Sequence, residues 1–137
     1  MKQGPFLAVA GAILVVAVSA GLGTLPAQQP PPAENKGVTT KPQGVIDLGP
    51  EIEGMAGRQL RSRWTTVAPG GTIGNHSHKD RPAIEYVLEG KFTEYRNGVM
   101  RELGPGDYVV ADKDTTHAWE NKGTTPVVLL PVDIFKP

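Results

Sequence analysis

The chain of 137 residues contains no cysteine, and aromatic residues make up only 6% of it. The absence of cysteine excludes disulfide bonds, thiol catalysis and thiolate-bound zinc, so the fold must rest on an ordinary apolar core. Fourteen basic residues balance fourteen acidic ones, which gives no electrostatic reason for a nucleic-acid partner. The scarcity of aromatic residues also argues against a stacking platform for bases. We therefore expect no nucleic-acid partner.

Long apolar runs are also absent, with one exception at the N-terminus. Lys2 is followed by an apolar run from Phe6 to Val18 and then by small residues, an order typical of a secretory signal peptide. An uncleaved membrane anchor is the alternative, because about 20 apolar residues span a bilayer and residues 5–25 carry no charge. Residues 1–27 are thus predicted to be an apolar helix that serves as signal peptide or anchor. The rest of the chain is then periplasmic or secreted, or membrane-anchored and facing outside the cytoplasm.

A proline-rich stretch separates this segment from the remainder. Residues 28–44 contain Pro30, Pro31, Pro32 and Pro42 among mostly polar residues. Such a composition cannot bury enough apolar area to offset the entropy lost on ordering. We expect an extended or disordered linker here.

Residues 45–137 are predicted to form one all-β domain. Short apolar runs are broken by Gly, Pro, Asn and Asp, and no 3.6-residue apolar period is sustained. Asn97-Gly98 between two strand-like runs is typical of a type I′ hairpin. The many short strands favour a sandwich or small barrel. The expected strands cover residues 45–48, 59–67, 72–75, 84–88, 91–96, 99–103, 107–110, 117–120 and 127–134.

Only three histidines occur in the chain, and their positions indicate a metal site. His76 and His78 are two residues apart, so on or beside a strand their imidazoles point to the same face. Glu85 on a neighbouring strand and His117 on a later one can add a carboxylate and a third imidazole. Nitrogen and carboxylate donors without sulfur suit iron(II), manganese, nickel, copper or zinc, and the pattern does not choose among these divalent metals.

These residues fall within two motifs that resemble those of the cupin superfamily. The first motif has a glycine five residues before His-x-His and ends in a second glycine; here Gly70, His76, His78 and Gly90 match it. The second motif has a turn of the Pro-x-Gly type, followed along the chain by a histidine and then an asparagine. Here Pro105-Gly106, His117 and Asn121 match it. The resemblance, to a small single-domain type-2 cupin, implies an antiparallel jelly-roll barrel. It also implies a metal near the barrel mouth, held by the motif histidines and glutamate.

The glutamate departs from the motif. The family spacing places it at Ala83, whereas Glu85 stands two residues later, about 6.6 Å further along a strand. Three interpretations stay open. Glu85 ligates the metal through a shifted backbone around Pro82, acts beside the metal as a general base, or forms a buried ion pair with Arg61 or Arg63.

The positions of several further side chains predict their roles. Trp119 lies two residues after His117 and is expected to point inward, either lining the ligand pocket or packing in the core. Asn121 is expected to satisfy backbone groups at a strand end. Among the arginines of residues 58–63, one that faces inward would bind a carboxylate substrate, although a solvated edge strand is the alternative.

The leading hypothesis is an exported cupin that binds one divalent metal through His76, His78 and His117. Oxygenase or isomerase chemistry on a small molecule would follow from an open metal position, with Glu85 as ligand or catalytic base. The alternative is a non-catalytic small-molecule-binding or sensor module, with a structural metal or with none, because fold does not dictate function. A homodimer is expected by analogy with cupins of this size.

Overall fold

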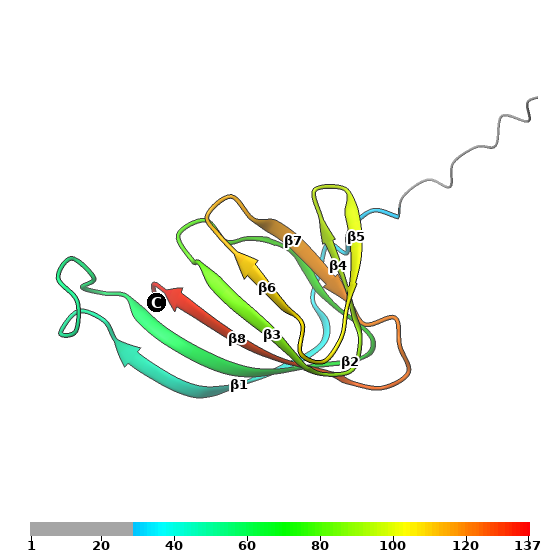
Figure 1. Cartoon of the computed structure of the whole chain (residues 1–137), viewed down its shortest axis with the longest axis horizontal. Coiled ribbons are helices and arrows are strands. Elements are labelled where there is room, and N and C mark those ends of the chain that lie inside the picture. Colours follow the sequence, from blue (N-terminus) through cyan, green and yellow to red (C-terminus); the bar gives the residue numbers. More distant parts are fainter. Residues whose placement is uncertain (1–28) are drawn as a thin grey trace, which may run out of the picture.

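The computed structural model describes residues 29–137, and in this part of the chain the only regular elements are strands. All strand pairs are antiparallel (Figure 1). In chain order they are β1 (Lys36–Asp47), β2 (Gln59–Ser77), β3 (Ala83–Glu89), β4 (Phe92–Arg96), β5 (Val99–Leu103), β6 (Tyr108–Ala111), β7 (Thr116–Glu120) and β8 (Val127–Phe135).

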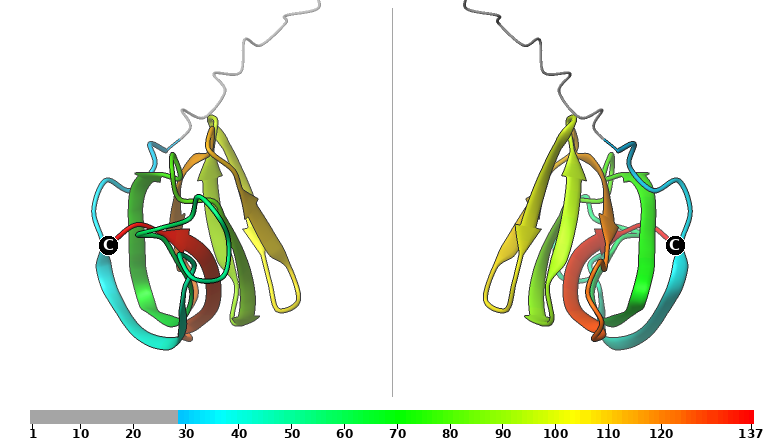
Figure 2. Two further views of the ribbon diagram at one scale, coloured as in Figure 1. Left: turned by 90° about the vertical axis from the view of Figure 1, so that its left-hand side faces the viewer. Right: turned by 90° about the vertical axis from the view of Figure 1, so that its right-hand side faces the viewer.

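The strands form one continuous sheet that folds over on itself. Its order is β5-β4-β7-β2-β8-β3-β6, and β1 pairs with β2 outside this path. Figure 2 shows how the sheet wraps around the interior, with β1, β2 and β8 on one side and the lime-green to gold strands, β3 to β6, on the other. This nearly closed antiparallel barrel is the architecture that the sequence predicted.

Strand β2 is the element that joins the two layers. Its first part pairs with β8 from Gln59 to Val67, and its last part pairs with β7 from Thr72 to Ser77. The sequence predicted two separate strands here, broken at Pro69-Gly70-Gly71. Instead the chain bends at Gly70, where φ is +68°, and continues as one strand. A bend of this kind turns a strand from one layer into the next without ending its pairing.

Strand β1 occupies much of the segment predicted to be a linker. It starts at Lys36 rather than at Val45 and pairs with β2 along most of its length. Eleven of its twelve residues are exposed, Val38 being the exception. Backbone hydrogen bonds to β2 hold this strand in place. Because its side chains are exposed, its sequence lacks the alternating apolar pattern from which a strand is predicted.

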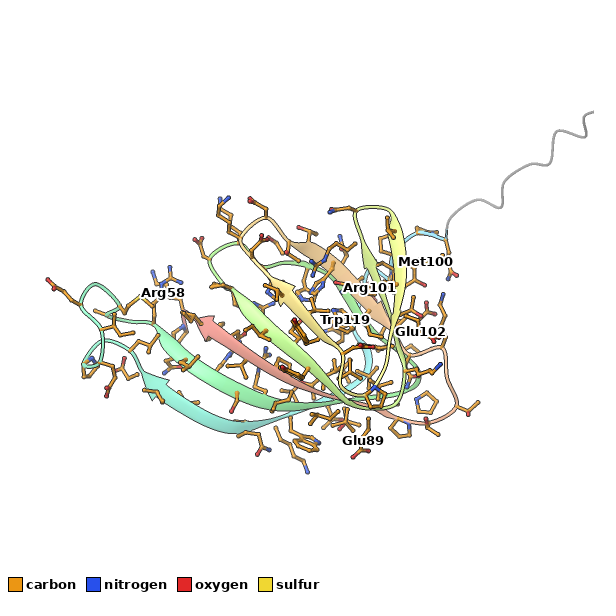
Figure 3. All side chains as sticks on the ribbon, in the orientation of Figure 1. Arg58, Glu89, Met100, Arg101, Glu102 and Trp119 are labelled. Carbon is orange, nitrogen blue, oxygen red and sulfur yellow. The ribbon has the colours of Figure 1, made fainter. Side chains whose placement is uncertain are left out.

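The predicted hairpin at Asn97-Gly98 is confirmed. Both residues have positive φ, 52° and 73°, as a type I′ turn requires, and Arg96 pairs with Val99 across it. Between the layers lies a core built from buried residues of seven strands, β2 to β8, of which Trp119, Phe92 and Leu129 are the largest. Figure 3 shows Trp119 inside the barrel and Glu89 pointing away from it.

Residues 1–28 lie outside the described part of the structure, and with them the segment assigned to export or anchoring. In residues 29–137 there is no helix of sufficient length and apolar character to cross a membrane. The signal peptide or anchor stays a prediction from sequence.

Asn121 follows the last residue of β7 and satisfies backbone groups at a strand end, as the sequence predicted. Its side chain is fully buried, and its Nδ2 lies 2.8–3.1 Å from the carbonyl oxygens of Val67, Ala68 and Thr125. Its Oδ1 accepts a hydrogen bond from the Gly123 N–H at 3.0 Å. The side chain thereby satisfies backbone groups of the β2 bend and of the loop before β8.

We expect Asn121→Ala to lower the free energy of unfolding by about 2–3 kcal/mol, because it leaves several buried backbone groups without partners. Urea denaturation followed by circular dichroism measures the change. Thr124→Ala, in an exposed position of the same loop, is the matched control and should change stability by less than about 0.5 kcal/mol. Equal stabilities of the two variants would contradict this role of Asn121.

Candidate metal centre

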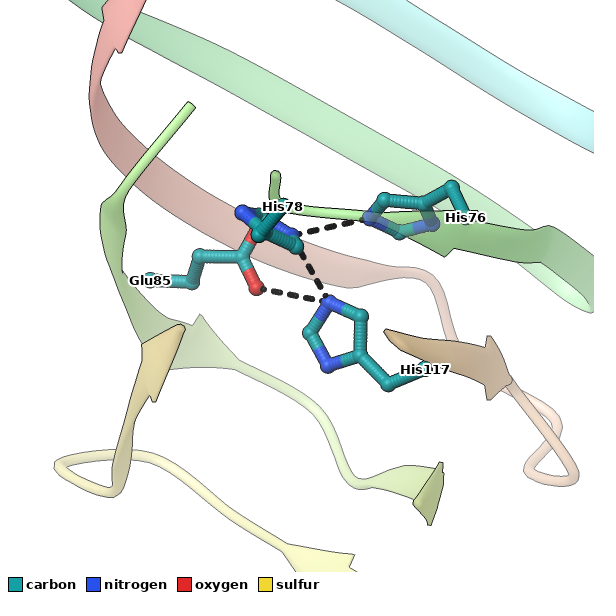
Figure 4. A group of neighbouring side chains, drawn as sticks. All are labelled: His76, His78, Glu85 and His117. Atoms are coloured by element: carbon teal, nitrogen blue, oxygen red, sulfur yellow. Dashed lines mark hydrogen bonds and ion pairs between the residues drawn. The ribbon is translucent and has the colours of Figure 1, made fainter. Parts of the chain in front are cut away.

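Two neighbouring strands bring the three histidines together. His76 lies near the end of β2 and pairs directly with His117 on β7, while His78 follows β2 by one residue. The Nε2 atom of His78 lies 3.1 Å from that of His76 and 3.0 Å from that of His117 (Figure 4). Ligand atoms held about 2.1 Å from one ion lie about 3.0–3.4 Å apart, so these spacings suit a shared metal.

The fourth group arrives from the facing side of the barrel. Glu85 belongs to β3, which pairs with β6 and β8, and its Oε2 lies 3.5 Å from Nε2 of His117. One ligand atom from each of the four residues lies within 4.8 Å of every other. The sequence-predicted residues His76, His78, Glu85 and His117 are thus brought into one cluster.

The glutamate reaches this cluster in spite of its displaced position in the motif. The turn after His78 carries Asp80 at φ +61°, and the Arg81 N–H donates to the His78 carbonyl, so the chain reverses before β3 begins. Ala83, where the family spacing places the acid, is the first residue of β3 and is buried. Glu85 lies on the same face two residues further along and points into the cluster (Figure 4).

The ion-pair interpretation of Glu85 has no counterpart in the contacts. Arg61 and Arg63 both donate to Asp133 on β8 instead. Glu85 Oε2 is buried and accepts no hydrogen bond from any described residue. Burial raises the pKa of Glu85 above its ordinary value, although His117 and Arg81 oppose that effect. A cation beside this carboxylate would offset the cost of burying its charge.

The other ring nitrogen of each histidine is held by an acceptor. Nδ1 of His76 lies 2.8 Å from the Gly74 carbonyl oxygen, and Nδ1 of His78 lies 3.0 Å from that of Arg81. Each Nδ1 must therefore carry the proton and donate it. In the neutral imidazole the Nε2 lone pair then faces the centre of the cluster, which is the arrangement that a metal ion needs.

His117 is held in the same way by a residue that the sequence did not single out. Its Nδ1 lies 2.8 Å from Oε1 of Glu94 on β4. Burial acts to raise the pKa of Glu94, but the hydrogen bond with His117 and the charge of Arg96 outweigh it and hold the pKa below its ordinary value. Arg96 and Arg101 pair with the carboxylate at 2.9 and 2.8 Å. Glu94 lies two residues after Phe92, so both side chains point to the inward face of β4. This spacing is the sequence signal that could have identified Glu94 as an inward residue.

Gly74 supports His76 through its backbone. Its N–H donates to Oδ1 of Asn35 at 2.8 Å while its carbonyl accepts from His76. A Cβ at this position would lie 2.6 Å from the carbonyl oxygen of Ala33, so only glycine permits the close approach of residues 33–35. The segment before β1 therefore helps to fix the first histidine.

Trp119 lies beside the cluster but in the core. It is 1% exposed and packs on Phe92 with ring centroids 4.8 Å apart. Its Nε1–H points at Nε2 of His117 from 3.3 Å. Of its two expected positions, the structure places it in the core, next to one ligand atom, and it is not among the residues that line the neighbouring cavity.

A cavity of about 230 Å³ opens next to His76 and Glu85. Arg63 and Arg81 also line it, together with the apolar side chains of Val38, Ile73, Leu129 and Pro131. This volume lies below the range of about 300–1,000 Å³ typical of drug-sized ligands, so the cavity suits a small molecule.

Burial lowers the pKa of both His76 and His78 to about 4 in the metal-free chain. Both imidazoles are thus neutral at pH 6, where a histidine with the ordinary pKa of about 6.5 is mostly charged. Neither imidazole has to lose a proton to bind a metal. We expect their ring resonances to titrate near pH 4 in NMR spectra of the chelator-treated protein. Assignment through His76→Gln and His78→Gln identifies the signals, and titration near pH 6.5 would contradict the buried neutral state.

The sequence is similar to a known protein family and to one characterised relative. The family model of the cupin domain (Cupin_2) matches residues 63–134. An oxalate-binding protein of Thermotoga maritima is 33% identical over 69 residues, which cover 50% of this chain and 57% of that protein. The chain thus spans little more than half the length of this relative.

Solved structures share the fold at lower identity. KdgF from Halomonas sp. superposes with a TM-score of 0.57 and 23% identity, over 71% of this chain and 78% of the other. The polyketide cyclase RemF from Streptomyces resistomycificus gives a TM-score of 0.59 and 21% identity, over 75% and 68% of the two chains. Since the family model covers more than half of the sequence and the barrel agrees with it, the chain belongs to the cupin family.

Proposed function

We propose that this cupin binds one divalent metal ion through Nε2 of His76, His78 and His117 and the carboxylate of Glu85. The observation that carries the proposal is the convergence of three imidazole lone pairs on a buried carboxylate oxygen that has no donor among the described residues. Four such acceptors facing one another repel unless a cation lies between them. Three nitrogens and one oxygen suit iron, manganese, nickel, copper or zinc.

We further propose that the site acts on a small molecule in the adjoining cavity. A bound metal of this kind supplies Lewis-acid activation, or redox chemistry if it is iron, manganese or copper. The chain's own residues would hold the metal, exclude bulk water from His78 and His117, and keep each Nδ1 protonated through its acceptor. Oxygenase or isomerase chemistry is the enzymatic candidate, and the cyclase among the structural relatives supports an enzyme.

A second candidate is a binding or sensor module without turnover. The relative named as an oxalate-binding protein favours it, and the same four ligands would then hold a metal that only anchors the ligand. Oxygen consumption and product formation over enols, thiols and phenols separate the two candidates. Turnover with any of them supports the enzyme, while binding without turnover supports the module.

Export through residues 1–27 is proposed on sequence grounds alone. N-terminal sequencing of the chain recovered from outside the cytoplasm tests it. A mature terminus near residue 20 or 27 supports cleavage, and an intact Met1 in the membrane fraction supports the anchor. Recovery of the intact chain from the cytoplasm would contradict both.

Metal content is the decisive measurement for the site. We expect about one equivalent of transition metal in the purified full-length chain and close to none in the His76→Ala/His117→Ala variant, measured by plasma mass spectrometry. Glu85→Gln should weaken binding by at least about 100-fold, since loss of an outer-shell partner alone typically costs 10- to 100-fold.

Glu89→Gln is the matched control for the glutamate, because Glu89 lies on the same strand, is exposed and points away from the barrel (Figure 3). Its metal affinity should equal that of the unmodified chain. A Glu85→Gln variant with unchanged affinity would remove Glu85 from the ligand set. An unmodified chain that takes up no divalent metal would overturn the proposed site.

A further inference from the structure

A cluster of charged residues lies beside the proposed metal site, and its charges do not balance. The fully buried carboxylate of Asp133 accepts from Arg61 at 2.7 Å and from Arg63 at 3.0 Å, and Nε of Arg81 lies 4.0 Å away. Three guanidinium groups therefore share one carboxylate. Glu85, which lines the same cavity as Arg63 and Arg81, adds a second negative charge, so one formal positive charge remains in excess. Such an excess is costly in a partly buried setting unless an anion accompanies it.

The three arginines differ in what their guanidinium groups contact. Arg61 satisfies its second face by stacking on Phe135, with 3.5 Å between Cζ and the ring centroid. Arg63 and Arg81 instead line the cavity that also contains His76 and Glu85. The excess positive charge is thus directed at the space next to the metal ligands.

Arg63 is incompletely bonded within the described residues. Its Nη2 donates to Asp133, but its buried Nε has no acceptor. Arg81 contacts the site through its backbone, since its carbonyl oxygen accepts a hydrogen bond from His78. Within residues 29–137 its guanidinium group makes no hydrogen bond, and its Nε lies 4.0 Å from Asp133. Both guanidinium groups thus keep donor capacity for a ligand.

The lining of the cavity also includes apolar side chains. Val38, Ile73 and Leu129 offer contact to a short carbon skeleton, and the remaining lining includes the uncharged polar side chains of Asn35, Thr40 and Thr65. A planar carboxylate matches the fork of a guanidinium group, and hydrogen bonds of this kind are among the stronger ones in proteins. The cavity thus combines two guanidinium groups with apolar contacts in a volume suited to a small molecule.

We propose that the ligand of this site is a small carboxylic acid whose carboxylate is bound by Arg63 and Arg81 and whose carbon chain contacts Val38, Ile73 and Leu129. The inference deepens the proposed function, because it names the substrate class for the cavity next to the metal. It requires no change in the metal ligands. Arg63 and Arg81 act here as specificity-determining residues that position the acid.

The test is an NMR titration of the full-length, ¹⁵N-labelled chain with butyrate, butanamide and inorganic phosphate, before and after metal removal by chelation. We expect butyrate to bind at least about tenfold more tightly than butanamide, which has the same shape without the charge. Arg63→Gln and Arg81→Gln should each weaken butyrate binding by about ten- to hundredfold. Lys91→Gln, which removes one charge from an exposed surface pair with Glu102, should leave it unchanged.

Several outcomes would overturn the proposal. These are equal binding of butyrate and butanamide, phosphate binding as tight as that of butyrate, no binding of butyrate at millimolar concentration, or equal affinities of the Arg63→Gln and Lys91→Gln variants. If Arg63→Gln fails to fold, Arg81→Gln and the comparison of butyrate with butanamide on the unmodified chain still decide the question. Folding of each variant is checked by its amide spectrum.

Metal content measured on the same samples separates this inference from the proposed function. Arg63→Gln and Arg81→Gln leave every proposed ligand and the Arg81 carbonyl in place, so both should bind metal as the unmodified chain does. Arginine-dependent butyrate binding in a chain that binds no metal would refute the metal site and support the carboxylate site. Normal metal content without butyrate binding would do the reverse.

Discussion

The pairing of β2 with both layers of the barrel is the constraint on which the rest of the structure depends. Its first part pairs with β8 and sets Arg61 opposite Asp133, while its last part pairs with β7 and sets His76 opposite His117. The bend at Gly70 lets one strand do both, and Asn121 bonds the backbone on the two sides of that bend. The proposed metal ligands and the arginine cluster therefore both depend on the register of one strand.

The electrostatics of the interior follow from this arrangement. Burial keeps His76 and His78 neutral, and acceptors at every Nδ1 direct their lone pairs inward. The hydrogen bond with His117 and the charges of Arg96 and Arg101 hold the pKa of Glu94 below its ordinary value, so it remains an acceptor for His117. Each supporting contact costs desolvation, and together they form a preorganised site in which the proposed cation would be the partner of Glu85.

The two halves of the site have complementary roles in the proposed chemistry. The histidine and glutamate cluster lies at the end of β2 and supplies ligands to a cation, whereas Arg63 and Arg81 present positive charge to the same cavity. A small acid that contacts both would be oriented at two points, and two-point orientation is what positions a reacting group. A binding module would use the same geometry for selectivity without turnover.

Much of the fold was predictable because it rests on local chemistry. Turn residues such as Asn97 and Gly98 require positive φ, and alternating apolar residues mark the strands β3 to β8 to within a few residues. Strand β1 escaped prediction, since its exposed side chains carry no alternation and only the backbone of β2 orders it. The break predicted within β2 was wrong because a glycine bend is read in sequence as a turn.

The sequence by itself determined which groups are available for chemistry: three histidines at spacings that share a face, a nearby glutamate and no thiol. Only the tertiary structure decided how they meet. Spacing along the chain places the motif acid at Ala83, but the turn after His78 and the register of β3 with β8 bring Glu85 to His117. Glu94, Asp133 and the orientation of Arg63 likewise depend on pairing between strands distant in sequence, and the order of residues along a single strand carries no information about that pairing.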